Sequence, residues 1–205
     1  MSQVLNEILS PTLLYPLLGL LALVVLWLLY RRFYKPRRTL KSVIAAIAHE
    51  RMSNLVLPKA DEGEILIDHL LLTSSGLLIL DLKEVEGVVF GSNKMQDWTV
   101  MGKERRYTFT NPQTALYDRI AAVRQVVREV PVIGRVLFLD GADFTKGVPD
   151  LVCNLDDLLA EFDDADPTGA SAQIDAFKPH WERVRQSATG TVSASRRPRA
   201  ATLPD

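Results

Sequence analysis

Three charged residues interrupt two apolar segments that are expected to be strands. Asp68 lies in segment 64–72, and Asp81 and Lys83 lie in segment 77–83. Asp81 and Lys83 are two residues apart, so both side chains point to one face of a strand. An alternative is that the two residues follow the end of a shorter strand and point into water, and that Asp68 and His69 form a hydrogen-bonded polar pair. The pattern alone leaves both interpretations open.

The turn between these segments, within Thr-Ser-Ser-Gly at 73–76, decides which residues face each other. A two-residue turn at Ser74-Ser75 places Asp68 opposite Asp81, whereas a turn one residue later places Asp68 opposite Lys83. Either turn brings the three side chains to one face of the hairpin. Two carboxylates this close repel each other unless one is protonated or a cation lies between them. Lys83 supplies one positive charge, and a divalent metal would supply more.

The surrounding pattern predicts the elements that hold this hairpin. Asn111 and Pro112 mark the start of a helix, because Asn caps a helix well and Pro is tolerated in its first turn. Helices are predicted at 39–52, 112–130, 156–162 and 173–185, and further strands at 54–58, 88–90, 98–100, 107–109, 135–139 and 151–153. This order of elements predicts an α/β sandwich with a central mixed sheet.

The segment 11–30 contains no charged side chain and is long enough for one transmembrane helix. A signal peptide or a buried core helix is the alternative. Five basic residues follow within 31–38, and by the positive-inside rule they place residues 1–10 outside and the remaining chain in the cytoplasm, at the inner cell membrane. They are Arg31, Arg32, Lys35, Arg37 and Arg38. The lipid bilayer is therefore an expected partner.

The chain of 205 residues is otherwise expected to form one domain at 39–163, a linker and amphipathic helix at 164–186, and a disordered tail at 187–205. Its 24 basic and 25 acidic residues nearly balance, which gives no global field toward nucleic acid. Cys153 is the single cysteine, so no intrachain disulfide can form, and its apolar neighbours predict a core thiol.

Several short strings, in this order along the chain, resemble the nuclease-related domain (NERD) family. They are Ile67-Asp68-His69, the run from Gly76 to Lys83, Gly87-Val88-Val89-Phe90-Gly91, Trp98 and Asn111-Pro112. The resemblance implies a restriction-endonuclease-like fold and hydrolysis of nucleic-acid phosphodiester bonds. It implies that Asp68, Asp81 and the carbonyl of Leu82 hold Mg²⁺ or Mn²⁺, and that Lys83 orients or activates the attacking water. Hard oxygen ligands and retained waters suit Mg²⁺.

The chain departs from the family pattern at two places. The family has a metal-binding glutamate early in its first helix, whereas this chain has no acidic residue between Thr39 and Glu50. Glu64 could partly replace it as a ligand, or could be a solvated residue at a strand start. The family also carries Gln three residues after the Asn-Pro proline, where this chain has Ala115 and, two places earlier, Gln113.

Substrate contacts are expected from Gln113 and from a basic segment that contains Lys103, Arg105 and Arg106. The alternative for the basic segment is an exposed hairpin without a ligand. The alternative function for the whole chain is a catalytically degenerate domain that serves as a membrane-tethered binding or scaffolding module.

Overall fold

The computed structural model describes residues 19–29, 38–58, 63–163 and 167–191. The chain divides into two compact units, residues 1–37 and 38–205. In the first unit, residues 19–29 form a helix whose side chains are all exposed. The expected segments 1–10 and 31–37, together with residues 11–18 and 30 of the expected transmembrane segment, lie outside the described residues.

Across the parts of the chain that are described, none of the helices combines the length and the apolar character that a membrane crossing requires. Of the predicted transmembrane segment 11–30, the structure describes the helix at 19–29, which by itself is too short to cross a membrane.

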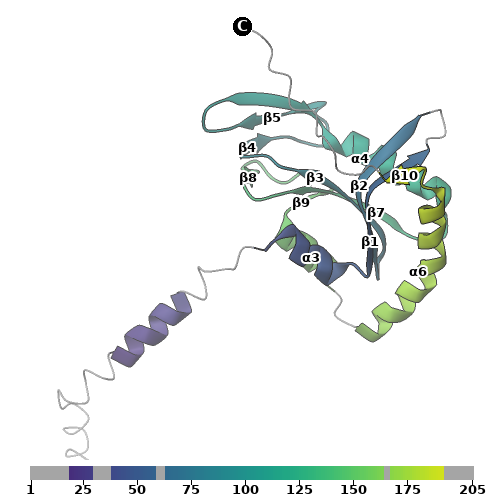
Figure 1. The fold of residues 1–205 in the computed structure, drawn as a ribbon. Helices are drawn as coiled ribbons and strands as arrows, with labels where there is room; N and C mark the ends of the chain where they lie inside the picture. Colours follow the sequence, from purple (N-terminus) through teal and green to yellow (C-terminus); the bar gives the residue numbers. More distant parts are fainter. Residues whose placement is uncertain (1–18, 30–37, 59–62, 164–166, 192–205) are drawn as a thin grey trace, which may run out of the picture. The chain divides into compact units, whose positions relative to one another are not determined.

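The second unit is built on a six-stranded mixed sheet, in the order β10-β1-β2-β3-β7-β9 (Figure 1). Strands β1, β2 and β3 pair antiparallel, and β7 and β9 extend the sheet in parallel with β3. The strands are β1 (Glu50–Pro58), β2 (Glu64–Thr73), β3 (Gly76–Lys83), β7 (Val132–Phe138), β9 (Val152–Cys153) and β10 (Gly190–Thr191). The predicted α/β fold with a central mixed sheet is thus confirmed.

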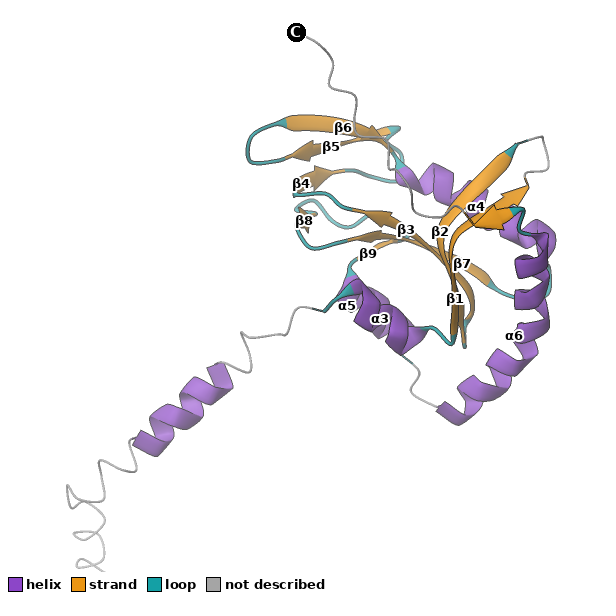
Figure 2. Cartoon of the chain, in the orientation of Figure 1, coloured by secondary structure: helices purple, strands orange, loops and turns teal. Residues whose placement is uncertain are grey.

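A smaller sheet follows β3 and has the order β6-β5-β4-β8 (Figure 2). Its strands are β4 (Gly87–Phe90), β5 (Asp97–Met101), β6 (Arg106–Thr110) and β8 (Ala142–Asp143). Trp98 from β5 is fully buried and stacks on Phe138 at the end of β7, with 6.3 Å between ring centroids. Because Phe138 is the register partner of Lys83, this contact holds the small sheet beside the end of β3.

Four helices cover the two faces of the large sheet. Helices α4 (Pro112–Val126) and α6 (Pro167–Ser187) pack on one face, and α3 (Leu40–Ile47) and α5 (Leu155–Phe162) pack on the other. Asn111 and Asn154 cap α4 and α5 by accepting hydrogen bonds from backbone N–H groups of the first turn. Apolar residues of β2 and β3 are buried on both faces, as expected for strands that are covered on both sides.

Two glycines allow the close approaches that fix β3 and β7. Gly76 has φ +128° and lies where a Cβ would meet the carbonyl of Pro131 at 2.3 Å. Gly134 lies under α4, where a Cβ would meet Ile120 at 2.7 Å. A side chain at either position would force the strands or the helix apart.

Several predicted boundaries were wrong. Residues 39–52 form a helix only to Ile47, because the chain then pairs with β2 from Glu50 onward. Helix α4 ends at Val126 and not at 130, and the predicted linker is helical from Pro167. Part of the predicted disordered tail is ordered, since residues 190–191 pair with β1 and Thr189 donates to the carbonyl of Val56; residues 192–205 lie outside the described chain.

Candidate functional site

Asp81 is a buried carboxylate near the end of β3, with only 2% of its surface exposed. Its oxygen Oδ1 accepts a hydrogen bond from Lys83 Nζ at 2.9 Å. This contact confirms that Asp81 and Lys83 share a face of the strand. The side chain of Lys83 is 30% exposed, so the ammonium group reaches solvent while it pairs with the carboxylate.

The second oxygen of Asp81 is held by Arg119, a residue that the sequence analysis did not identify. Arg119 Nη1 lies 3.2 Å from Asp81 Oδ2, and its Nε donates to the carbonyl oxygen of Leu66 on β2 at 2.8 Å. Arg119 comes from the middle of α4, between the buried Leu116 and Ile120. A charge on the buried stripe of an amphipathic helix needs a partner, and that position was the signal available in the sequence.

The hairpin has its turn at Ser74-Ser75, because Thr73 pairs with Gly76. This register places Asp68 opposite Asp81, although the paired residues end one step earlier, at His69 and Leu80. In a regular strand, residues three apart face opposite sides of the sheet. Ile67 and Leu70 nevertheless both belong to the core cluster under α4, so the alternation of β2 is interrupted between them. Alternation therefore does not fix the face on which the half-buried Asp68 lies.

The other polar residue at this change of face is His69, which pairs across the sheet with Ser53. Ser53 Oγ and His69 Nδ1 are 3.0 Å apart. The neighbouring Asn54 has φ +53°, a left-handed conformation that Asn tolerates better than most residues. Burial lowers the pKa of His69, and Arg51 lowers it further, while Asp68 acts in the opposite direction. The imidazole is therefore neutral at neutral pH.

The other residues that were expected to bind the metal, Glu64 and Leu82, lie at opposite ends of the β2–β3 hairpin sequence, one exposed and one half-buried. Glu64 is exposed at the start of β2, and four residues of strand place it about 13 Å along the chain from Asp68. Leu82 is half-buried and pairs with Leu137 of β7. Glu50, the first acidic residue after the segment where the family glutamate is expected, accepts hydrogen bonds from Trp181 Nε1 and Arg185 and so joins β1 to α6.

Gln113 is buried in a network that connects α4 with two loops. Its Nε2 donates to Asn93 Oδ1 at 3.0 Å and to the carbonyl of Asp150. Asn93 in turn donates to the Asp150 carboxylate at 2.7 Å. In this arrangement the Gln113 amide stabilises the loops, and its expected contact with substrate stays a prediction.

The basic segment lies at the β5–β6 hairpin of the small sheet. Lys103, Arg105 and Arg106 are all exposed. The Arg105 guanidinium lies over the ring of Tyr107, 5.9 Å from its centroid. A pair of this kind leaves the arginine accessible and presents an aromatic edge beside it.

In the observed conformation the Asp81 cluster offers no free carboxylate oxygen to a divalent cation. Each oxygen of Asp81 is paired with a positively charged side chain, Oδ1 with Lys83 and Oδ2 with Arg119. Within the described residues, no group of three or more His, Cys, Asp or Glu side chains could hold a metal ion. An ion could reach Asp81 only after Arg119 or Lys83 had moved away, because the positive charges would otherwise repel it.

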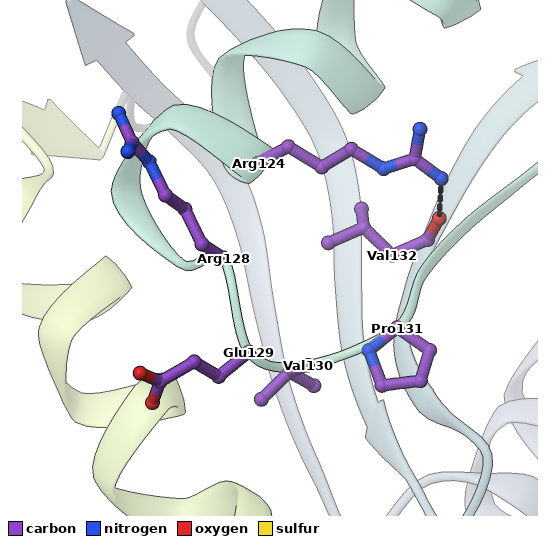
Figure 3. A pocket seen from close by; sticks show the side chains of 6 residues that line it. All are labelled: Arg124, Arg128, Glu129, Val130, Pro131 and Val132. Carbon is purple, nitrogen blue, oxygen red and sulfur yellow. Dashed lines mark hydrogen bonds between the residues drawn. The ribbon is translucent and has the colours of Figure 1, made fainter.

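A pocket of about 440 Å³ lies elsewhere, between the end of α4 and the start of β7 (Figure 3). Arg124 and Arg128 line it together with the segment 129–132, and Arg124 donates to the carbonyl of Val132 at 3.1 Å. Since Val132 pairs with Leu77 at the beginning of β3, this pocket is at the opposite end of the sheet from Asp81. It is not part of the Asp81 site.

The fold and the buried Asp81–Lys83 pair define an α/β domain with a charged cluster near the end of a central strand. Residues 37–139, about half of the chain, match the family model described as the nuclease-related domain, and the chain belongs to this NERD family. A protein of Bacillus anthracis that is named only as uncharacterized is 29% identical over 73 residues. That alignment covers 35% of this chain and 34% of the relative, so the chain spans about a third of that relative's length. No solved structure matches the chain.

Proposed function

We propose that this chain acts on nucleic acid through its NERD domain and hydrolyses phosphodiester bonds, with a restriction-endonuclease-like arrangement of its sheet. The observation that supports this most directly is Asp81, a buried carboxylate paired at 2.9 Å with Lys83 near the end of a central strand. Placing a lysine two residues after a carboxylate holds an acidic and a basic group on one face, within reach of the same phosphate.

The metal proposed for this activity is Mg²⁺ or Mn²⁺. Its ligands would be Asp68, Asp81 and the Leu82 carbonyl, with Glu64 as a further candidate, in a state in which Arg119 has left Asp81. A bound divalent ion supplies Lewis-acid stabilisation and a more acidic water. The contribution of Lys83 is a positive charge at the position where negative charge develops during attack on phosphorus.

The enzyme hypothesis predicts that Lys83→Ala lowers the cleavage rate by about a hundredfold or more while nucleic-acid binding falls far less, because Lys83 would act mainly in the transition state. The assay uses the purified full chain with plasmid, single-stranded DNA and RNA, each with Mg²⁺ and with Mn²⁺. Lys178→Ala is the matched control, since Lys178 is an exposed lysine on α6 that pairs only locally, with Asp175. Wild-type protein that cuts none of the three substrates would contradict the enzyme hypothesis.

The second candidate is a catalytically degenerate domain that serves as a binding or scaffolding module. The pairing of Asp81 with Arg119 favours it, because this pair neutralises the carboxylate without a metal. Under this hypothesis Lys83→Ala changes only the melting temperature. Removing one cation from a buried carboxylate then destabilises the fold.

We also propose that residues 11–30 anchor the chain in the inner cell membrane, with residues 1–10 outside and the NERD domain in the cytoplasm. This proposal depends on the uncharged apolar run and on the five basic residues that follow it. Anionic lipid headgroups would attract the same basic residues and keep the domain near the membrane surface.

A further inference from the structure

Arg119 and Lys83 converge on one carboxylate from two different elements, and most of their hydrogen-bond donors remain available. A guanidinium has five N–H donors and an ammonium has three. Arg119 uses two of its donors, for Asp81 and the Leu66 carbonyl, and Lys83 uses one, for Asp81. The Arg119 side chain is 18% exposed and that of Lys83 is 30% exposed, so both side chains reach the solvent although the carboxylate between them does not.

The hydrogen bond to the Leu66 carbonyl fixes the plane of the Arg119 guanidinium. Arg119 Nε donates to β2 and Nη1 donates to β3, so the two bonds fix both the plane and the rotation of the group. A guanidinium held in this way has its Nη2 group, which neither bond uses, oriented before any ligand arrives. The N–H groups of Nη2 can donate charge-assisted hydrogen bonds to phosphate oxygens.

We propose that Arg119 is a phosphate-binding residue for nucleic acid, and that it binds the phosphodiester without a metal. This inference rests on the proposed function for the class of ligand, but not on cleavage. Asp81 is then a positioning residue that keeps the two cations side by side and competes with the phosphate for their donors. Lys83 provides the second donor group.

The test measures equilibrium binding of the full chain to a fluorescein-labelled single-stranded oligonucleotide and to its duplex, in EDTA, by fluorescence anisotropy. Arg119→Gln should weaken binding about tenfold, because it removes a charge-assisted contact. It should also reduce the slope of log K against log salt by about 0.7 for the single strand and about 0.9 for the duplex, the change expected for one lost phosphate contact. Arg128→Gln removes the same charge from an exposed position just after α4 and should alter neither value.

Asp81→Asn should act in the opposite direction and tighten binding about three- to tenfold, because it removes the competing negative charge and releases both cations. Circular dichroism checks that each variant is folded. Arg119→Lys keeps the charge but not the planar fork and should bind with an affinity between those of wild type and Arg119→Gln. If Arg119→Gln does not fold, the Asp81→Asn and Arg119→Lys results decide.

The outcomes separate this inference from the proposed enzyme. Suppose that wild-type protein binds nucleic acid in EDTA, that this binding depends on Arg119, and that no substrate is cut. This result would support the phosphate-binding role of Arg119 and contradict the nuclease hypothesis. If wild-type protein cuts nucleic acid but folded Arg119→Gln binds it as tightly as wild type, the nuclease hypothesis is supported and the role of Arg119 is contradicted. The inference is overturned if wild-type protein does not bind in EDTA, or if Asp81→Asn binds no more tightly than wild type.

Discussion

The carboxylate of Asp81 is almost completely removed from water, and a buried charge is costly unless it is paired and hydrogen-bonded. Here each oxygen has its own cation, Lys83 from the same strand and Arg119 from α4. The sequence predicts that a carboxylate at this place needs a cation beside it. In the structure Arg119 joins Lys83 in neutralising Asp81, which makes α4 part of the site.

His69 gives a prediction about pH. Burial lowers the pKa of His69 in the folded protein below its usual value near 6.5. As the pH falls below about 6.5 the unfolded chain therefore takes up a proton first, and stability that is present above this pH is lost until the folded-state pKa is reached. Wild-type melting temperature should fall relative to that of His69→Asn between pH 8 and pH 5. Parallel melting curves for the two proteins over this range would contradict the assignment.

At the residue scale, what could be predicted followed from short-range geometry. The Asp81–Lys83 pair follows from strand alternation, and the opposition of Asp68 and Asp81 follows from one of two possible turns. Arg119 lies 38 residues from Asp81 and was missed, because only the packing of α4 on the sheet brings them together. Strand alternation also could not predict the face on which Asp68 lies. The alternation of β2 is interrupted there, beside Asn54 with its left-handed backbone.

At the scale of elements, α6 completes the core even though the family match ends at residue 139. Trp181 and Val184 are fully buried in the same cluster as β2, β3 and α4. The indole N–H of Trp181 also donates to Glu50 at 2.8 Å, which joins the C-terminal helix to the first strand. The NERD domain of this chain thus depends on a helix well beyond the matched segment.

Trp181→Ala should accordingly lower the free energy of unfolding by about 3–5 kcal/mol, the usual cost of truncating a buried tryptophan. Trp181→Phe loses the hydrogen bond to Glu50 and part of the ring but keeps much of the apolar contact, so it should cost less, about 2 kcal/mol. Urea denaturation followed by circular dichroism measures both. Equal stability of the Ala and Phe variants would mean that α6 contributes little to the core.

The errors in predicting elements have a common physical origin. Residues 45–51 are good helix formers without Gly or Pro, yet the chain leaves the helix after Ile47 because Glu50 and the residues after it pair with β2. Tertiary pairing overrides local propensity at such places. The strands of the central hairpin were placed within a residue, since buried apolar runs bounded by a clear turn signal carry their own limits.

At the scale of the whole molecule, the chain divides into residues 1–37 and residues 38–205. What the protein does and where it does so are therefore separate questions, one for each unit. The proposed activity depends on the second unit, which contains the Asp81 cluster, the basic hairpin and α6. Under the proposed anchoring, the first unit would decide where this activity takes place. A domain held at a membrane would meet nucleic acid or other partners only on one side of that membrane, so topology limits the possible substrates.

Topology gives the last prediction. Residues 1–10 contain no Lys or Arg, whereas five basic residues lie within 31–38, so protease added outside intact cells should leave the NERD domain uncut. Changing Arg31, Arg32, Arg37 and Arg38 together to Glu should make part of the population sensitive, because lost basic residues count heavily in this rule. Arg196→Glu with Arg197→Glu is the control, since these positions are too far from residues 11–30 to affect orientation. Digestion of wild-type protein would reverse the assigned orientation, and release of the chain from membranes by alkaline carbonate would contradict the anchor.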